Sequence, residues 1–222
     1  MHSKLEILVG DAIKAEEWPK FDLCVANLPY QISSPFILRL IKAGRGYRCA
    51  VVMVQKEFAA RLLAQPGDKL YCRLSANVQF HCKVAHLLKV SRNSFRPPPR
   101  VDSAVVRLEP RHPKPPVSIR EWDGLLRLAF LRKNKKLSAN FQGQAVAKLL
   151  YHNCQTVLKA NSSFLTTPLV SCTATDDVFA MESRIAEILR ASGFDGKRAR
   201  TMDEDDFLRL LLAFKREGIY FG

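Results

Sequence analysis

The sequence contains no long run of apolar residues. No stretch approaches the roughly 20 consecutive apolar residues that a membrane-spanning helix needs. The first residues also differ from a secretory signal peptide, because Lys4, Glu6 and Asp11 interrupt the apolar positions. We therefore expect neither a membrane protein nor a secreted one. A hydrophobic content of 47% in 222 residues is enough for a packed core, in one large domain or two small ones.

Paired cysteines are missing as well. No two of the six cysteines stand in a CxxC arrangement, and no histidine lies at zinc-finger spacing from them. Several have apolar neighbours, as Cys24 does, and a reduced thiol packs there as a small hydrophobe. We expect reduced thiols and no metal site, with a zinc or disulfide framework as the less favoured alternative. The six are Cys24, Cys49, Cys72, Cys82, Cys154 and Cys172.

Acidic residues are absent from two long stretches, 69–101 and 124–175, each of which carries seven basic residues. The whole chain has 35 Lys and Arg against 21 Asp and Glu, a net charge of +14. This excess favours a polyanionic partner, with nucleic acid ahead of an anionic membrane. The alternative is that the charges form ordinary solvated faces of a basic protein.

Prolines divide the chain. Seven of the twelve lie between Pro97 and Pro116, where the fixed φ and the missing donor exclude helix interiors and central strands. The second group of prolines predicts a stiff linker at 111–117, between one domain at 1–110 and another at 118–222.

Before the linker, short apolar runs alternate with helical patterns, which indicates an α/β fold with a parallel sheet at its centre. The last two expected strands can pair around the turn at Pro97–Pro99. We expect strands at 5–11, 21–29, 48–55, 83–90 and 101–109, and helices at 36–43 and 56–64.

After the linker the pattern is helical. Ser118 with Glu121 forms a capping box before a helix expected to extend to Leu137, and Thr201 with Glu204 forms a second box before a later helix. Another amphipathic helix is expected at 181–192, and 140–175 reads as helix plus loop. These patterns predict that residues 118–222 form a small helical domain.

The most informative motif is Asn27-Leu28-Pro29-Tyr30, which follows an expected strand at the end where open α/β sheets bind ligands. An adenine N6 amine is a poor nucleophile, because its lone pair is delocalised into the ring. The amide oxygen of Asn27 and the carbonyl of Leu28 can accept its N–H groups and favour a pyramidal amine that attacks a methyl group. Pro29 fixes the turn, and Tyr30 offers a flat face to an extruded base. This chemistry needs no general base.

Each of these residues also has a plainer interpretation. The tetrapeptide can be a simple turn after a buried strand, with Tyr30 as an aromatic at the edge of the core. Asp11, at the end of the preceding expected strand, can accept a hydrogen bond from an adenine amine or form an ordinary Asx turn.

The chain resembles the small-subunit rRNA adenine dimethyltransferase family, the KsgA-type bacterial enzymes and, more closely, their eukaryotic Dim relatives. The resemblance covers almost the whole chain and lies in NLPYQISSP, VGDAI, YCRLS, FRPPPRVDSAVVRLEP, FLRKNKKLSANF and KRARTMDEDDFLRLL. It implies a class I (Rossmann-like) methyltransferase domain and a helical rRNA-binding domain. It also implies S-adenosylmethionine-dependent dimethylation of N6 on two adjacent adenosines in the 3′-terminal hairpin of small-subunit rRNA, and a role in ribosome biogenesis.

The resemblance implies roles for individual residues. Asn27 contacts the target amine beside the cofactor, Leu28 supplies its carbonyl and Pro29 fixes the turn. Tyr30 and Phe95 stack on the two faces of the adenine, although Phe95 can also be a core residue beside the proline turn. Further implied contacts are Asp11 to the cofactor's adenine ring, and to rRNA the basic run at a helix end, Arg132, Lys133, Lys135 and Lys136.

The chain departs from the family pattern near its beginning. The glycine-rich GxGxG turn and the next acidic residue, which hold the methionine and ribose of the cofactor, are absent. In the family's sheet, two strands lie between the equivalents of 5–11 and 21–29. We therefore expect an N-terminally incomplete member with its first two strands missing and an unpaired edge on 21–29, inactive and weak in cofactor binding by itself. Direct pairing of 5–11 with 21–29 is the alternative.

Other functions compete with the enzyme. The first is a non-catalytic RNA-binding factor in ribosome assembly. The others are a mitochondrial transcription factor on the same fold and a DNA adenine methyltransferase, which the helical half and the proline motif disfavour. The resemblance implies a monomer that acts on pre-ribosomal particles, without a membrane, in the nucleus or nucleolus. Without the eukaryotic resemblance, the cytoplasm is expected.

Overall fold

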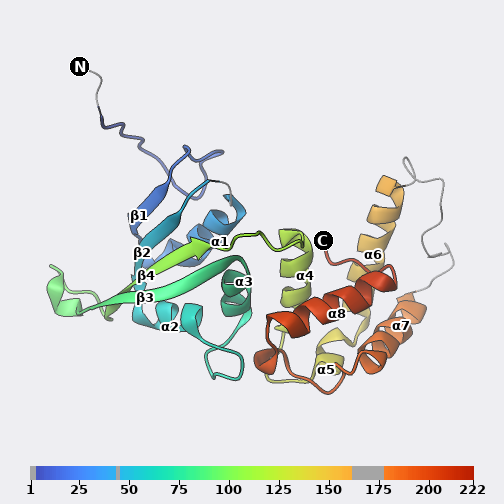
Figure 1. Cartoon of the computed structure of the whole chain (residues 1–222). Coiled ribbons are helices and arrows are strands. Elements are labelled where there is room, and N and C mark those ends of the chain that lie inside the picture. Colours follow the sequence, from blue (N-terminus) through green and yellow to red (C-terminus); the bar gives the residue numbers. More distant parts are fainter. Residues whose placement is uncertain (1–3, 44–45, 162–177) are drawn as a thin grey trace. The chain divides into compact units, whose positions relative to one another are not determined.

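The computed structural model describes residues 4–43, 46–161 and 178–222 (Figure 1). The chain forms two compact units, each built from two segments. Unit 1 combines Met1–Ala60 with His81–Lys114, and unit 2 combines Arg61–Phe80 with Pro115–Gly222. The chain therefore enters unit 2 twice. Within the described ranges, no helix is both long and apolar enough to cross a membrane.

In the part of the chain that the structure describes, unit 1 is built on a four-stranded sheet with the order β1-β2-β4-β3. The strands are β1 (Leu23–Asn27), β2 (Cys49–Gln55), β3 (Cys82–Val90) and β4 (Ser103–Pro110). Strands β1 and β2 are parallel, whereas β4 pairs antiparallel with both β2 and β3. The α/β class and the pairing of the last two strands are confirmed. The prediction of a parallel sheet holds only for β1 and β2, so the sheet is mixed.

The pairing of β2 with β4 forms the apolar centre of unit 1. Every second residue of β2 is buried, and so is its partner in β4, in the pairs Ala50–Leu108, Val52–Val106 and Val54–Ala104. Helix α1 (Ser33–Ala43) adds the buried side chains of Phe36, Ile37, Leu40 and Ile41. Burial of each larger aliphatic side chain stabilises the fold by about 1.5–3 kcal/mol.

The strand predicted at 5–11 does not form. This segment has no regular secondary structure, and its apolar side chains are exposed, from 69% for Leu8 to 97% for Val9. A strand requires a hydrogen-bonded neighbour, and the sequence pattern alone does not supply one. In the described sheet β1 is an edge strand, with Val25 72% exposed. The expected unpaired edge is confirmed, and the alternative pairing of 5–11 with β1 is wrong.

Unit 2 is helical. Helix α2 (Lys56–Leu63) leads into it from unit 1. Its core centres on Trp122, which is fully buried, stacks on Phe80 with ring centroids 3.6 Å apart, and meets Phe207 edge-on. The other helices are α3 (Arg73–His81), α4 (Ile119–Ala129), α5 (Leu137–Phe141), α6 (Gln144–Asn161), α7 (Val178–Ala191) and α8 (Glu204–Arg216).

Residues 61–80 lie in unit 2, although the sequence analysis placed them in the first domain. Tyr71, Ala76 and Phe80 are buried in the same apolar core as Trp122. Arg73 also makes a bidentate ion pair with Asp123 of α4, with the closest nitrogen–oxygen distance 2.6 Å, and Asn77 donates to the same carboxylate. The prolines at 110–116 mark one place where the chain leaves unit 1, but they carry no information on the packing of α3.

The ends of the helices confirm one local prediction and correct two others. Ser118 caps α4 as expected, by accepting a hydrogen bond from the Arg120 amide. The helix ends at Ala129 and not at Leu137, because the buried Asn140 side chain donates to the Ala129 carbonyl at its C-terminus. The cap of α8 is Asp203 and not Thr201, since the Asp203 carboxylate accepts from the Asp206 amide. An ionised carboxylate is favoured there by the helix dipole.

The carboxylate of Glu121 has a different role from the predicted capping box. It accepts hydrogen bonds from the amides of Phe221 and Gly222, at 3.1 Å each, and so holds residues 221–222 against α4. Gly124 allows this close approach: a Cβ at that position would lie 2.2 Å from the carbonyl oxygen of Phe221.

Gly124→Ala should therefore destabilise the protein. Alanine favours a helix over glycine by about 1 kcal/mol, but the collision with the Phe221 backbone should outweigh this and give a net loss of about 2 kcal/mol. Urea unfolding measures the change. Gly196→Ala is the matched control, since an added Cβ there meets no atom within 4 Å. A gain in stability for Gly124→Ala would refute the proposed packing.

Candidate active site and nucleic-acid interface

The predicted Asn27–Tyr30 turn lies at the carboxyl end of β1. Asn27 is the last residue of the strand and its side chain is exposed, whereas the Leu28 side chain is buried. The Leu28 amide donates to the Met53 carbonyl of β2 at 3.4 Å. Pro29, with φ −56° and ψ 130°, then directs the chain into the short 3₁₀ turn η1 (Tyr30–Ile32). The turn presents an amide side chain on a backbone that is held by the neighbouring strand.

Tyr30 is fixed by a contact with β4, which lies two strands away from β1 in the sheet. Its hydroxyl lies 2.8 Å from the Oγ of Ser103, the first residue of β4, in hydrogen-bond distance. Ser103 is fully buried, and Tyr30 itself is half-buried. One end of the Tyr30 side chain is therefore anchored and the ring is not a freely moving surface aromatic.

Phe95 lies in the connection between β3 and β4. It follows the short 3₁₀ turn η2 (Arg92–Ser94), is half-buried, and its amide donates to the Arg92 carbonyl at 3.3 Å. The turn is attached to the start of β4, because the Arg92 amide donates to the Asp102 carboxylate at 3.1 Å. The segments that carry Tyr30 and Phe95 are thus both tied to neighbouring residues of one strand end.

Asp11 adopts the Asx turn that the sequence analysis gave as its plainer interpretation. Its Oδ1 accepts hydrogen bonds from the amides of Ile13, at 2.8 Å, and Lys14, at 3.3 Å. Its backbone carbonyl accepts from Lys14 and Ala15. The side chain is exposed, so the second carboxylate oxygen remains accessible to a ligand. The turn and a ligand contact are therefore compatible.

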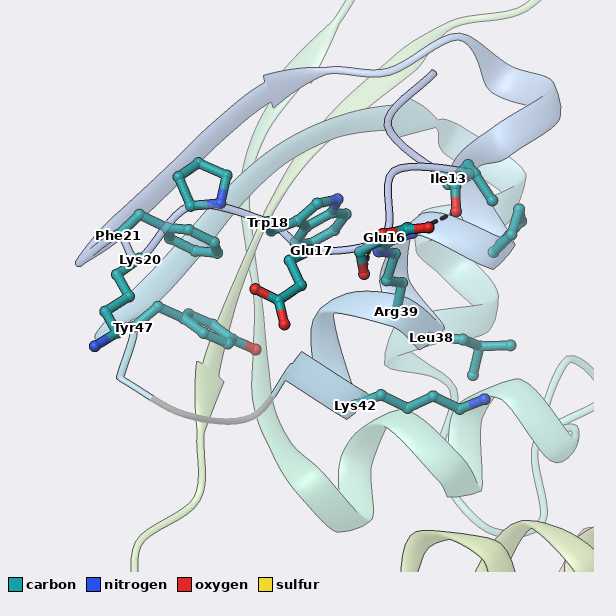
Figure 2. A pocket seen from close by; sticks show the side chains of 12 residues that line it. Ile13, Glu16, Glu17, Trp18, Lys20, Phe21, Leu38, Arg39, Lys42 and Tyr47 are labelled. Carbon is teal, nitrogen blue, oxygen red and sulfur yellow. Dashed lines mark hydrogen bonds between the residues drawn. The ribbon is translucent and has the colours of Figure 1, made fainter. Parts of the chain in front are cut away.

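A clamp from helix α1 holds the segment after Asp11 (Figure 2). The Arg39 guanidinium donates to the carbonyls of Ile13, Ala15 and Glu16 and lies over the Trp18 ring, 5.0 Å from its centroid. The Trp18 indole in turn donates to the Ala12 carbonyl at 2.8 Å. An open groove of about 710 Å³ beside α1 is lined in part by Ile13, Glu16, Trp18 and Arg39. The Arg39 clamp fixes a segment that has no regular secondary structure of its own.

Buried thiols and phenols carry the shifted pKa values. Burial raises the pKa of the Cys24 thiol, and that of Cys82 to about 11. Burial also raises the pKa of Tyr47 and Tyr71. All four groups are therefore protonated near neutral pH and are poor candidates for nucleophiles or bases. Cys172 lies outside the described residues, and the other five cysteines are free thiols.

The predicted RNA-binding run lies in the turn that follows the end of α4, and its last residue, Lys136, is the N-cap of α5. The Arg132 guanidinium is used within the turn, where it donates to the Ala139 carbonyl and the Asn140 side chain. Lys133 donates to the Lys69 carbonyl at 2.8 Å. Lys135 and Lys136 are exposed. Two basic residues of the run therefore make hydrogen bonds within the protein, whereas the other two are exposed to solvent.

Two further basic segments lie beside this run. Lys136 forms an isolated antiparallel bridge with Arg198, and the Arg200 carbonyl accepts from the Gly67 amide at 2.7 Å. We call the resulting group of basic residues the electropositive cluster. It comprises Lys69, Arg132, Lys133, Lys135, Lys136, Lys197, Arg198 and Arg200. Residues Lys197–Arg200 begin the motif KRARTMDEDDFLRLL, and nothing in the sequence predicts that they lie beside residues 132–136.

Comparison with known proteins decides the family. The model for ribosomal RNA adenine dimethylase matches residues 1–188 of the chain. The chain belongs to the ribosomal RNA adenine dimethylase family. The suspected resemblance is confirmed, and the chain is, by family, an rRNA adenine methyltransferase.

Individual relatives agree with this family. A probable dimethyladenosine transferase of Drosophila melanogaster is 52% identical over the whole chain, which covers 69% of that relative. The dimethyladenosine transferase of Saccharomyces cerevisiae is 48% identical, and the chain covers 68% of it. The crystal structure of a dimethyladenosine transferase from Plasmodium falciparum superposes with a TM-score of 0.84, at 42% identity over 98% of this chain and 74% of that one. A 23S rRNA methyltransferase, ErmE, shares the fold at a TM-score of 0.55 and 21% identity over 95% of this chain and 72% of that one.

Within this dimethylase, the roles of the predicted site residues stay predictions. The structure attaches the segments of Tyr30 and Phe95 to one strand end, and it leaves the side chains of Asn27 and Asp11 exposed. Sequence reasoning missed Arg39, Asp102 and Ser103, because their contacts join positions that are distant in the sequence.

The Arg39 clamp is directly testable. Arg39→Ala removes charged donors to several backbone carbonyls, so local opening of residues 11–16 should become easier by about 1.4 kcal/mol. The amides of Ile13 and Lys14 should then exchange with deuterium roughly tenfold faster. Lys42→Ala, an exposed change on the same helix, is the control. Unchanged protection in Arg39→Ala would show that the clamp does not hold the turn.

Proposed function

We propose that the protein dimethylates N6 of two adjacent adenosines in the 3′-terminal hairpin of small-subunit rRNA, with S-adenosylmethionine as methyl donor, during ribosome biogenesis. The observation that carries this proposal is the Asn27–Tyr30 turn at the carboxyl end of β1, with Tyr30 held by Ser103, in a chain of the rRNA adenine dimethylase family.

Asn27 and Leu28 act on the target amine. The Asn27 amide oxygen and the Leu28 carbonyl accept the two N6–H groups, which localises the nitrogen lone pair and directs it away from the ring. Support comes from the exposed Asn27 side chain and from the bond between the Leu28 amide and Met53, which holds this backbone to β2. Such preorganised acceptors need no reorientation during the reaction. The amine proton leaves to solvent after the methyl group has been transferred.

Tyr30 and Phe95 hold the extruded base. An adenine inside a hairpin stem or stacked loop is not reachable, so the enzyme has to stack it outside the helix, and aromatic faces compensate the lost base stacking. Pro29 supports this role because it fixes the backbone immediately before the Tyr30 ring.

The residues present fit the adenine end of the cofactor. Asp11 keeps one accessible carboxylate oxygen for an amine, and Asn27 lies at the carboxyl end of β1, where sheets of this class bind ligands. When bound, S-adenosylmethionine supplies an electrophilic methyl group on a sulfonium. The sequence has no GxGxG turn for its methionine part. We therefore propose that the 222-residue chain by itself binds the cofactor weakly and is inactive at ordinary cofactor concentrations.

The electropositive cluster grips the rRNA. Lysine and arginine contacts to phosphates position an RNA without reading its sequence. Within the cluster, Lys135, Lys136 and Arg198 are exposed, whereas Lys197 is paired with Asp206 at 2.8 Å. We expect the exposed members to make the phosphate contacts. The partner is the small-subunit rRNA in a pre-ribosomal particle, bound by a monomer in the nucleus or nucleolus, in keeping with the eukaryotic relatives.

A non-catalytic RNA-binding role in ribosome assembly is the second candidate. The electropositive cluster favours it, because the cluster is present in unit 2 independently of any cofactor site.

The role of Asn27 can be tested by methyl transfer to small ribosomal particles with labelled cofactor at millimolar concentration. Under these conditions we expect slow transfer from the wild-type chain and at least about 100-fold less from Asn27→Ala, because one acceptor of the target amine is lost. RNA affinity should be unchanged. Transfer that is insensitive to the substitution would refute the role of Asn27. RNA binding without any transfer would favour the assembly-factor function, and saturation at micromolar cofactor would overturn the proposed weak binding.

The cluster predicts the salt dependence of RNA binding. In Lys135→Gln/Arg198→Gln, two exposed charges are lost, and the slope of log K against log salt should fall by about 1 for each lost phosphate contact. Fluorescence anisotropy with a labelled hairpin RNA measures it. Lys215→Gln is the control, since it lies at the opposite end of the 13-residue helix α8 from Arg200. An equal slope for the double variant and the control would exclude the cluster as the RNA contact.

A further inference from the structure

Two neighbouring residues at the start of β4 each contact one of the two segments that carry Tyr30 and Phe95. The Ser103 hydroxyl lies 2.8 Å from the Tyr30 hydroxyl, and the Asp102 carboxylate accepts the Arg92 amide at 3.1 Å. Neither residue belongs to the predicted set of base or cofactor contacts.

Ser103 lies in β4, which has a paired strand on each side. It pairs with Gln55 of β2 on one side and with Val90 of β3 on the other, and its side chain is fully buried. Asp102 is held through its carbonyl, which accepts the Lys56 amide at 3.0 Å. The two residues therefore have fixed positions. The segments they contact are a short turn and a loop, which have few constraints of their own.

The contact of Ser103 restricts the Tyr30 ring. Tyr30 begins a turn of three residues, so its backbone alone leaves several side-chain rotamers accessible. A hydrogen bond at the far end of the ring selects the one rotamer that reaches Ser103. The ring plane then keeps a constant direction relative to the sheet.

The contact of Asp102 acts on Phe95 through the backbone. Its carboxylate holds the Arg92 amide at the first residue of η2, and Ser91 caps the same turn by accepting the Asn93 amide. The turn then ends with the Phe95 amide bonded to the Arg92 carbonyl. The position of Phe95 therefore follows from the position of Arg92, and that follows from Asp102.

We propose that the Asp102-Ser103 dipeptide is the positioning element of the base-stacking site and sets the separation and orientation of the Tyr30 and Phe95 rings. The inference rests on the proposed function, in which these rings hold the target adenine. Neither residue contacts the substrate. Each acts on it through an aromatic ring, and a preorganised gap between two rings favours one flat base in a single position.

The test uses the whole chain and a small-subunit 3′-terminal hairpin RNA that carries 2-aminopurine at one target adenosine. Stacking of this base between aromatic rings changes its fluorescence, while anisotropy of a dye on the RNA end gives the overall affinity. We expect Ser103→Ala to reduce the 2-aminopurine response several-fold and to change RNA affinity less than twofold. Tyr30→Phe, which keeps the ring and removes the other half of the contact, should behave in the same way.

The double variant Ser103→Ala/Tyr30→Phe should be no worse than either single variant, since both remove the same bond. Asp102→Asn keeps an acceptor for the Arg92 amide and should retain most of the response, whereas Asp102→Ala should lose it. Ser75→Ala is the matched control, because Ser75 is a fully buried hydroxyl in unit 2 that donates to the Arg61 carbonyl. It should lose stability without losing the response.

The outcomes distinguish the positioning role of Asp102 and Ser103 from the stacking role of Tyr30 and Phe95. A normal response in Ser103→Ala, or additive losses in the double variant, would overturn the positioning role while leaving the stacking site intact. A response that falls in Ser75→Ala as far as in Ser103→Ala, in parallel with the loss of stability, would also overturn it. Absence of any response from the wild-type chain, with RNA still bound, would refute the stacking role of Tyr30 and Phe95 and the inference with it.

Discussion

The antiparallel pairing of β4 with β2 is the interaction on which the candidate active site depends. It joins buried residues in three alternate pairs and ends at Gln55 and Ser103, beside the end of β1. The segments that carry Tyr30 and Phe95 are attached there, and Leu28 is bonded to the neighbouring β2. Loss of this pairing would release every segment that is proposed to touch the target base.

The two units meet different chemical demands. Unit 1 has to place a few atoms accurately, and it does so with a sheet, a clamp from α1 and short turns. In the proposed function, unit 2 has only to attract phosphates, which requires charge without precise orientation. Its electropositive cluster accordingly lies on connecting segments, two of which are joined by the bridge between Lys136 and Arg198. Rigid geometry and simple accumulation of charge are thus divided between separate parts of one chain.

Predictions succeeded where a local signal decides the structure. The Asn27–Tyr30 turn, the pairing around Pro97–Pro99 and the Ser118 cap each follow from residues within a few positions of one another. Predictions failed where a distant partner decides. Residues 5–9 have the composition of a strand but no neighbour in the described sheet, and α3 packs with helices that begin some 40 residues later. The joining of residues 132–136 to 197–200, and of Ser103 to Tyr30, leaves no periodicity in the sequence from which it could be read.

The bonds between Glu121 and residues 221–222 have a consequence for the order of folding. They close a loop of 100 residues, and the packing of Gly124 against Phe221 belongs to the same closure. A nascent chain can form α4 early, but it cannot complete the surroundings of that helix until residue 222 has left the exit tunnel of the translating ribosome. During synthesis the packing of α4 around Glu121 and Gly124 therefore remains incomplete for the time needed to translate about 100 further residues, several seconds at usual elongation rates.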